Sequence, residues 1–154
     1  MIGIVIATHA QLGKSLMETA EFVLGEILEE VEFVSIDLKE DADMLRDKIA
    51  AGIKKVNRGQ GVLILTDMFG GTPSNLSLSF LQEEKVEVIT GVNLPMLVRS
   101  INRRSGKTLR ELSNEVYNYG QKSISLASSI LKGNKRAGGA GPDDSLALQE
   151  SRKE

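Results

Sequence analysis

Four short apolar runs, separated by longer amphipathic segments, restrict this chain to one class of fold. The runs are almost continuously apolar or β-branched, as is typical of strands covered on both faces: Ile2–Thr8, Val31–Ile36, Val62–Thr66 and Val86–Thr90. This alternation predicts an α/β fold with an open parallel sheet and helices on both faces. The common short doubly wound topology then gives the strand order 2-1-3-4.

The predicted helices lie between and after these strands. They are Leu12–Leu24, Asp43–Asn57 with Asp43 near its N-cap, a helix begun by Thr72 as N-cap and Pro73, Met96–Arg104, and Thr108–Tyr119. Three basic residues of the fourth helix are predicted to form a solvated face: Arg99, Arg103 and Arg104.

The segment that follows Gly120 is ambiguous. Ser123–Leu131 fits a strand of period two, and it also fits a continued helix, with Gly120 as a candidate break. From Lys132 onward the composition is too polar and glycine-rich to build a core. We therefore predict one domain over residues 1–132 and a flexible tail over 133–154.

Composition excludes several classes of function. A net charge of -2 gives no electrostatic case for nucleic-acid binding, and no apolar run approaches the roughly 18 residues of a membrane span. The first residues are predicted to be strand and not a signal peptide, so we expect a cytoplasmic location. With no cysteine and one histidine, disulfides, thiol catalysis and a multi-histidine metal site are excluded. No metal or cofactor is expected.

That single histidine, His9, follows the first strand, and Asp67 follows the third. In the order 2-1-3-4 these strands are neighbours, so both side chains reach the crevice at the carboxyl ends of the strands. An aspartate that accepts from Nδ1–H fixes the tautomer and leaves Nε2 with a free lone pair. The pair is therefore a candidate nucleophile or base, although a lone histidine is more often only a polar surface residue.

The loop after Asp67 adds a candidate anion site. Gly70 and Gly71 allow close approach of backbone N–H groups, and Thr72, Ser74 and Asn75 add hydroxyl and amide groups at a predicted helix start. An imidazole beside a phosphate cradle suggests phosphoryl transfer onto histidine. The chain has no GxxxxGK[ST] sequence, so direct nucleotide hydrolysis is not expected. Phe69 is either a core residue or a docking residue.

Three stretches together resemble the IIA domain of the mannose-type bacterial sugar phosphotransferase system. They are Ile4-Val-Ile-Ala-Thr-His9, Asp67-Met-Phe-Gly-Gly-Thr-Pro-Ser-Asn75 and Thr90-Gly-Val-Asn-Leu-Pro-Met-Leu97, in the order found in that family. The resemblance implies a flavodoxin-like fold, phosphorylation of His9 at Nε2 and Asp67 as its hydrogen-bond partner. It also implies HPr as the phosphate donor and a separate IIB protein as the acceptor, which serves a membrane permease (IIC and IID).

Family members form homodimers in which a C-terminal strand is exchanged between subunits. Ser123–Ala127 is our candidate for that strand, and Phe69 and Asn93 are candidate docking residues for partner proteins. The sequence does not assign a role to Arg99 or identify the sugar.

Three functions are compatible with these residues. The first is a phosphocarrier enzyme, a phosphotransferase with a phosphohistidine intermediate. The second is a regulatory protein, without a sugar permease, whose phosphorylation state governs its binding to another protein. The third is a binding module for a small phosphorylated ligand, in which His9 is only a polar lining residue.

Overall fold

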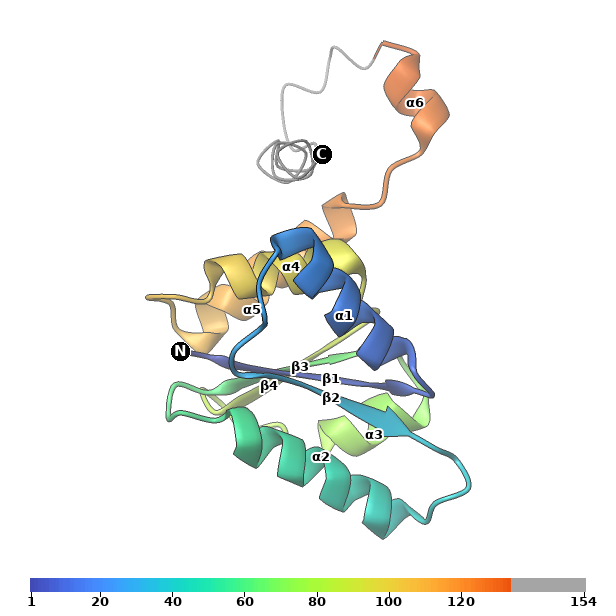
Figure 1. The fold of residues 1–154 in the computed structure, drawn as a ribbon. Helices are drawn as coiled ribbons and strands as arrows, with labels where there is room; N and C mark the ends of the chain where they lie inside the picture. Colours follow the sequence, from blue (N-terminus) through green and yellow to red (C-terminus); the bar gives the residue numbers. More distant parts are fainter. Residues whose placement is uncertain (134–154) are drawn as a thin grey trace.

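A four-stranded parallel sheet lies between two layers of helices in the computed structural model, which describes residues 1–133 (Figure 1). The strands are β1 (Gly3–His9), β2 (Val31–Ile36), β3 (Val62–Thr66) and β4 (Val86–Thr90). Their order is β2-β1-β3-β4 and every neighbouring pair is parallel, so the predicted sheet is confirmed. Apart from Gly133, the predicted tail lies outside the described residues.

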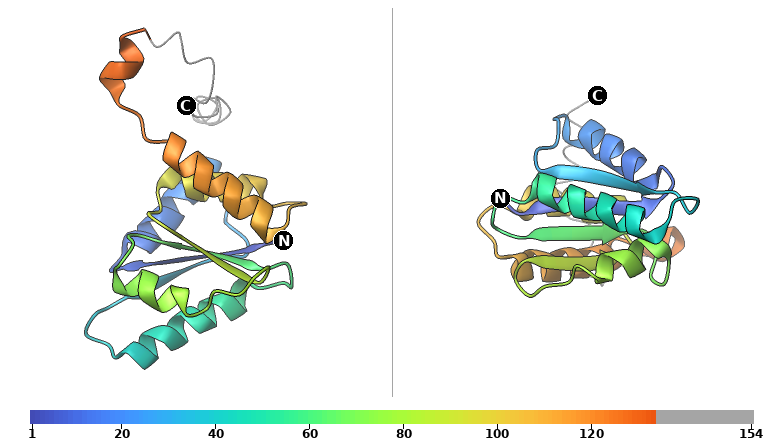
Figure 2. Two further views of the ribbon diagram at one scale, coloured as in Figure 1. Left: turned by 180° about the vertical axis from the view of Figure 1, so that it is seen from behind. Right: turned by 90° about the horizontal axis from the view of Figure 1, so that it is seen from below.

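The helices divide between the two faces of the sheet, with α1, α4 and α5 on one face and α2 and α3 on the other (Figure 2). Their bounds are Leu12–Leu24 for α1, Ala42–Val56 for α2, Thr72–Leu78 for α3, Leu94–Arg103 for α4, Leu109–Lys122 for α5 and Ala127–Leu131 for α6. The short helix α6 projects away from the body of the molecule (Figure 1).

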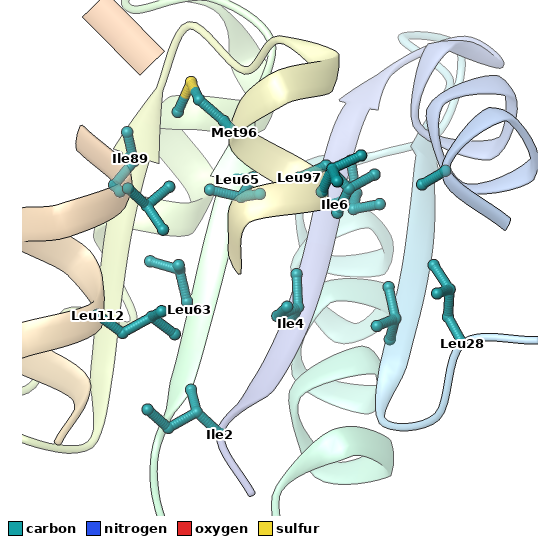
Figure 3. Close-up of a cluster of buried hydrophobic side chains, with 14 of the residues drawn as sticks. Ile2, Ile4, Ile6, Leu28, Leu63, Leu65, Ile89, Met96, Leu97 and Leu112 are labelled. Carbon is teal, nitrogen blue, oxygen red and sulfur yellow. The ribbon is translucent and has the colours of Figure 1, made fainter. Parts of the chain in front are cut away.

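The core follows the alternation of side chains along the strands. In β1, Ile4 and Ile6 belong to the apolar cluster under α1, α4 and α5 (Figure 3). Val5 and Ala7 belong to the cluster against α2. All four are fully buried. A strand packed on both faces cannot shift by one residue without exchanging its two clusters, so the position of His9 at the end of β1 is well determined.

Four predicted helix starts differ by one or two residues from the observed ones, and among them α4 begins at Leu94 and α5 at Leu109. Helix α2 begins at Ala42 and is capped by Asp41, two residues before Asp43, and the Asp41 carboxylate accepts the Met44 N–H at 2.8 Å. Helix α3 has Gly71 as its N-cap, so Thr72 is its first residue and no side-chain cap bond forms there.

The prediction of a solvated arginine face was wrong for Arg104, which is only 5% exposed. Its guanidinium donates to the carbonyls of Ile2, Glu29 and Glu30 at 3.2, 2.6 and 3.3 Å. Burial lowers its pKa, against the opposing attraction of nearby glutamates. Because the acceptors come from segments far away in the sequence, Arg104 ties the start of β1 to the turn before β2.

The other two arginines pack against α5. Arg103 is exposed as predicted, and its Nε lies 3.1 Å from a Glu115 carboxylate oxygen. Arg99 is less exposed: its Nε lies 2.9 Å from the same oxygen, and its guanidinium stacks 4.5 Å above the Tyr119 ring. Lys107 also pairs with Glu115.

The chain after Tyr119 differs from the prediction. Gly120 does not break α5; a Cβ there would lie 2.4 Å from Met96, so glycine is needed for close packing of α5 on α4. In this single chain Ser123–Ala127 is not a strand: Ser123 caps α5 and α6 begins at Ala127. A strand needs a partner edge, and pairing with a second chain stays a prediction.

Candidate functional site

The site lies where β1 and β3 end side by side. Ala7 is paired with Thr66 in the parallel register, so His9 and Asp67 follow at neighbouring strand ends. From there the chain leaves β1 for α1 on one face and leaves β3 for α3 on the opposite face (Figure 1). Opposite exits of this kind open a crevice at the carboxyl ends of the strands. The fold therefore brings the side chains of His9 and Asp67 together, as predicted.

One carboxylate oxygen of Asp67 holds His9 twice. Oδ2 lies 2.7 Å from Nδ1 of the ring and accepts the His9 backbone N–H at 2.9 Å. The imidazole ring and the backbone of His9 are thus both held by Asp67 Oδ2. Since Nδ1 faces a carboxylate, it carries the proton, and Nε2 keeps its lone pair. The His9 side chain is 33% exposed, whereas that of Asp67 is 10% exposed.

The charge of Asp67 is stabilised by its neighbours. Burial alone would raise the pKa of the carboxyl group, but hydrogen bonds from the backbone and the ring of His9 lower it, and so do the attraction of that ring and the Met68 backbone N–H. The net result is a pKa below the ordinary value. A charged carboxylate can then stabilise positive charge on the imidazole as the ring reacts.

The glycines of the next loop lie beside the ring. A Cβ on Gly71 would lie 2.8 Å from Cε1 and 3.4 Å from Nε2 of His9, so only glycine leaves the ring in this place. Gly70 has a φ of +83°, a backbone conformation that favours glycine, with open space around its Cα. Among residues 1–133, no acceptor is recorded for the backbone N–H of Gly70 or of Thr72.

Comparison with known proteins identifies the family. A family model described as the PTS system fructose IIA component, EIIA-man, matches residues 3–117. The chain belongs to this family. The Bacillus subtilis (strain 168) protein named PTS system fructose-specific EIIA component is 30% identical over 149 residues, which cover 95% of this chain and 100% of that protein.

Two further similarities support this membership of the IIA components. The PTS system mannose-specific EIIAB component of Escherichia coli (strain K12) is 41% identical over 104 residues, which cover 67% of this chain and 32% of that protein. The match thus spans about a third of the longer relative. The crystal structure of the PTS IIA protein associated with the fucose utilization operon of Streptococcus pneumoniae is 29% identical with a TM-score of 0.74, covering 84% of this chain and 95% of that one.

Of the remaining predicted site residues of this IIA component, Phe69 is exposed to solvent, whereas Asn93 is bonded within the fold. Phe69 is 77% exposed, so it is not a core residue, and Met68 beside it is exposed too. Asn93 caps α4 by accepting the Met96 N–H at 3.0 Å, while its amide donates to the Gly120 carbonyl at 3.2 Å. The side chain of Asn93 is therefore occupied in holding α4 and α5 together.

Sequence reasoning treated Ser74 as a polar group of the anion site and missed the burial of three hydroxyl groups beneath it, those of Thr8, Thr66 and Ser74. Thr8, just before His9, accepts the Gly13 N–H at 2.7 Å and so closes the turn into α1. Thr66, just before Asp67, lies 2.5 Å from the hydroxyl of Ser74. The signal was a threonine at the end of each of two otherwise apolar strands.

Within residues 1–133 the IIA component has no cluster of three or more histidine, aspartate or glutamate side chains that could hold a metal ion. In the same residues, no helix has the length and apolar character needed to cross a membrane.

Proposed function

We propose that the chain is a phosphocarrier that accepts a phosphoryl group on Nε2 of His9 from phospho-HPr and passes it to a IIB protein for sugar uptake. One observation carries this proposal: Asp67 Oδ2 lies 2.7 Å from Nδ1, which leaves Nε2 as the reacting nitrogen. PTS IIA proteins are phosphotransferases in general, and membership of that family supports the same reaction type.

The transfer is a single exchange of nitrogen–phosphorus bonds. The lone pair of Nε2 attacks phosphorus as the bond to the donor imidazole breaks, and that bonding pair returns to the donor nitrogen. The proton on Nδ1 stays in its hydrogen bond to Asp67, which offsets the positive charge gained by the His9 ring. The transition state is loose, so positioning and hydrogen bonds supply most of the catalysis.

The oxygens of the phosphoryl group need donors beside Nε2. We assign this role to the backbone N–H groups of Gly70 and Thr72 and to the Thr72 hydroxyl, since the Gly71 N–H donates to the Met68 carbonyl at 3.4 Å. The close approach of Gly71 to the ring supports the assignment, since the loop backbone then borders the reacting nitrogen.

Exposed apolar side chains follow the ends of β1 and β3 and suit docking of the two partner proteins. Leu12 begins α1 beside His9, while Met68 and Phe69 belong to the opposite loop, and all three are exposed. We propose Phe69 as a docking residue. The cap and tether made by Asn93 argue for a structural role at that position instead.

The decisive experiment is incubation with phosphoenolpyruvate, the general phosphotransferase enzyme and HPr, followed by intact mass at neutral and acidic pH. We expect one phosphoryl group, stable in base and lost in acid, as for a phosphoramidate. His9→Ala should abolish labelling and keep the fold by circular dichroism. Undiminished labelling of that variant would exclude the proposal. Onward transfer to IIB, tested in the same mixture, separates a carrier from a regulatory protein.

We also propose that two chains pair through the segment after α5. Ile124, Leu126 and Ile130 are exposed apolar residues, and β4 is an edge strand. A second chain that covers the exposed apolar residues and the β4 edge would form a two-fold dimer. Truncation after residue 132 should leave a dimer by light scattering, whereas truncation after residue 120 should not. A dimer in the shorter chain would contradict the pairing.

A further inference from the structure

Two buried hydroxyl groups and a backbone carbonyl form a series of hydrogen bonds under the Asp67 loop. The hydroxyls of Thr66 and Ser74 are 2.5 Å apart, and the Ser74 hydroxyl also lies 2.6 Å from the Met68 carbonyl. Thr66 and Ser74 are both fully buried. A carbonyl can only accept, and a serine hydroxyl has one hydrogen. Ser74 must therefore donate to Met68, and Thr66 must donate to Ser74.

These hydrogen bonds lie on both sides of Asp67, the residue that orients His9. Thr66 precedes Asp67, Met68 follows it, and Ser74 reaches back from the first turn of α3. The Thr66 carbonyl is also fixed, because it accepts the N–H groups of Gly91 and Val92 at 3.0 and 2.9 Å. The backbone on both sides of Asp67 is thus attached to the sheet on one side and to α3 on the other.

The backbone of Met68 transmits this attachment to the His9 ring. The Met68 N–H donates to Asp67 Oδ1 at 3.0 Å, while the Met68 carbonyl accepts from Ser74 and, at 3.4 Å, from the Gly71 N–H. Gly71 in turn borders the His9 ring so closely that a Cβ would not fit. A shift of the Met68 backbone would therefore alter both the carboxylate and the glycine that hold His9.

Burial of two hydroxyls is unfavourable compared with an apolar pair of the same volume unless their hydrogen bonds are used. Ser77, in the same helix, offers a direct contrast. It is as deeply buried, but its hydroxyl donates at 2.7 Å to the carbonyl of Pro73, within α3. The Ser74 hydroxyl instead connects α3 to the loop that carries Asp67, where the Asn75 amide also donates, at 3.4 Å, to the Gly70 carbonyl.

We infer that Ser74 is a positioning residue for phosphoryl acceptance: with Thr66, it holds the Asp67–Gly71 loop so that the carboxylate stays on Nδ1 and Nε2 stays open. The inference rests on the proposed phosphorylation of His9. Ser74 touches neither the phosphoryl group nor the ring, and acts through Met68.

The test compares Ser74→Ala with Ser77→Ala in the full chain. Acceptance of phosphate from phospho-HPr should slow about tenfold in Ser74→Ala, the effect of one lost hydrogen bond of about 1.4 kcal/mol in the transition state, and stay within twofold in Ser77→Ala. Thr66→Val and Thr66→Ser test the other hydroxyl of the same hydrogen-bonded pair. Thr66→Val removes the hydroxyl with little change of shape and should accept phosphate slowly. Thr66→Ser keeps the hydroxyl and should accept phosphate at the parent rate.

A second readout does not depend on transfer. Because the chain has one histidine, the ring nitrogens give unambiguous signals in ¹⁵N NMR. At a pH of about 9, where an ordinary imidazole is neutral, the parent and Ser77→Ala should show the Nδ1–H tautomer. Ser74→Ala should show a new population of the Nε2–H form.

Equal rates and equal ring spectra in Ser74→Ala and Ser77→Ala would overturn the inference. A slow Thr66→Ser together with a fast Thr66→Val would do the same. If the parent chain is not phosphorylated on His9, the proposed function fails. The ring spectra then still decide whether Ser74 positions the Asp67–His9 pair.

Discussion

The two ends of β1 each hold a charged group against the backbone, with opposite results. At the start of the strand, the Arg104 guanidinium is buried and donates to three carbonyls, including that of Ile2. At the far end, the Asp67 carboxylate accepts the His9 backbone N–H and also the ring, which is one-third exposed. One group is closed off from solvent, and the other presents a reactive atom to it.

The difference lies in whether a polar atom is open to solvent. The three hydrogen bonds of Arg104 are directed to the protein's own backbone, and its Nε, which has no partner within residues 1–133, is buried. The bonds of Asp67 leave Nε2 of His9 without an intramolecular partner among the described residues. A strand fixed at one end by a buried cation therefore presents a partly exposed imidazole at the other.

The largest expected effect concerns Asp67. Asp67→Ala should fold but accept phosphate more slowly by a factor on the order of 10²–10⁴, because the tautomer is no longer fixed and the reacting ring loses its counter-charge. Asp41→Ala removes a carboxylate that only caps α2 and should retain the parent rate. Single-turnover transfer from phospho-HPr measures both. An Asp67→Ala rate within twofold of the parent would show that Asp67 has no role in phosphate acceptance.

A smaller effect is expected from the glycine beside the ring. Gly71→Ala should slow acceptance by about tenfold or more, since the new methyl displaces the imidazole from its place. Gly70→Ala has open space and should mainly lose stability, about 1–2 kcal/mol for a left-handed backbone. Rates and thermal unfolding of the two variants give the comparison. The reverse ranking of rates would show that the ring does not react where it lies.

At the other end of the strand, stability and transfer should separate. Arg104→Met should lower the free energy of unfolding by about 2–4 kcal/mol, because buried carbonyls lose a charged donor, and leave the transfer rate within twofold. Arg103→Met, on the exposed side of the same turn, should change the free energy of unfolding by about 0.5 kcal/mol or less. Urea unfolding provides the values. Slow transfer in a folded Arg104→Met would mean that the two ends are coupled.

The smallest effect is the response to acid. The pKa of Asp67 is lowered in the folded chain, so its contribution to stability is present above the unfolded pKa of about 4 and is lost as the pH falls through the folded value. His9→Ala removes the ring bond and should raise that pKa towards its ordinary value. Carbon-13 NMR titration of the carboxyl group tests this. A parent Asp67 that titrates at or above the ordinary value contradicts it.

The sequence was a good guide wherever a local pattern decides the structure. Strands buried on both faces are recognisable as continuous apolar runs, and the strand order then brings His9 and Asp67 together. Burial of Arg104 was not predictable, because it depends on carbonyls near Glu29 and Ile2 that only the folded chain brings to α4. The Thr66–Ser74 pair was missed for the same reason: neither hydroxyl has a partner until α3 packs against β3.

Glycine was the least predictable residue. Gly120 was a candidate helix break, but it lies inside α5 where Met96 leaves no room for a side chain. The meaning of a glycine depends on its neighbours in space, which a local pattern does not contain. The same holds for Ser123–Ala127, whose conformation depends on what it packs against.

The one-third exposure of the His9 ring has a consequence for timing. A phosphoryl group on Nε2 would be within reach of two different proteins in turn, without any rearrangement of the buried Asp67 beneath it. It would equally be within reach of water. If the proposed phosphorylation occurs, hydrolysis and capture by an acceptor protein would compete for the group, and the supply of acceptor would help to set the fraction of phosphate delivered.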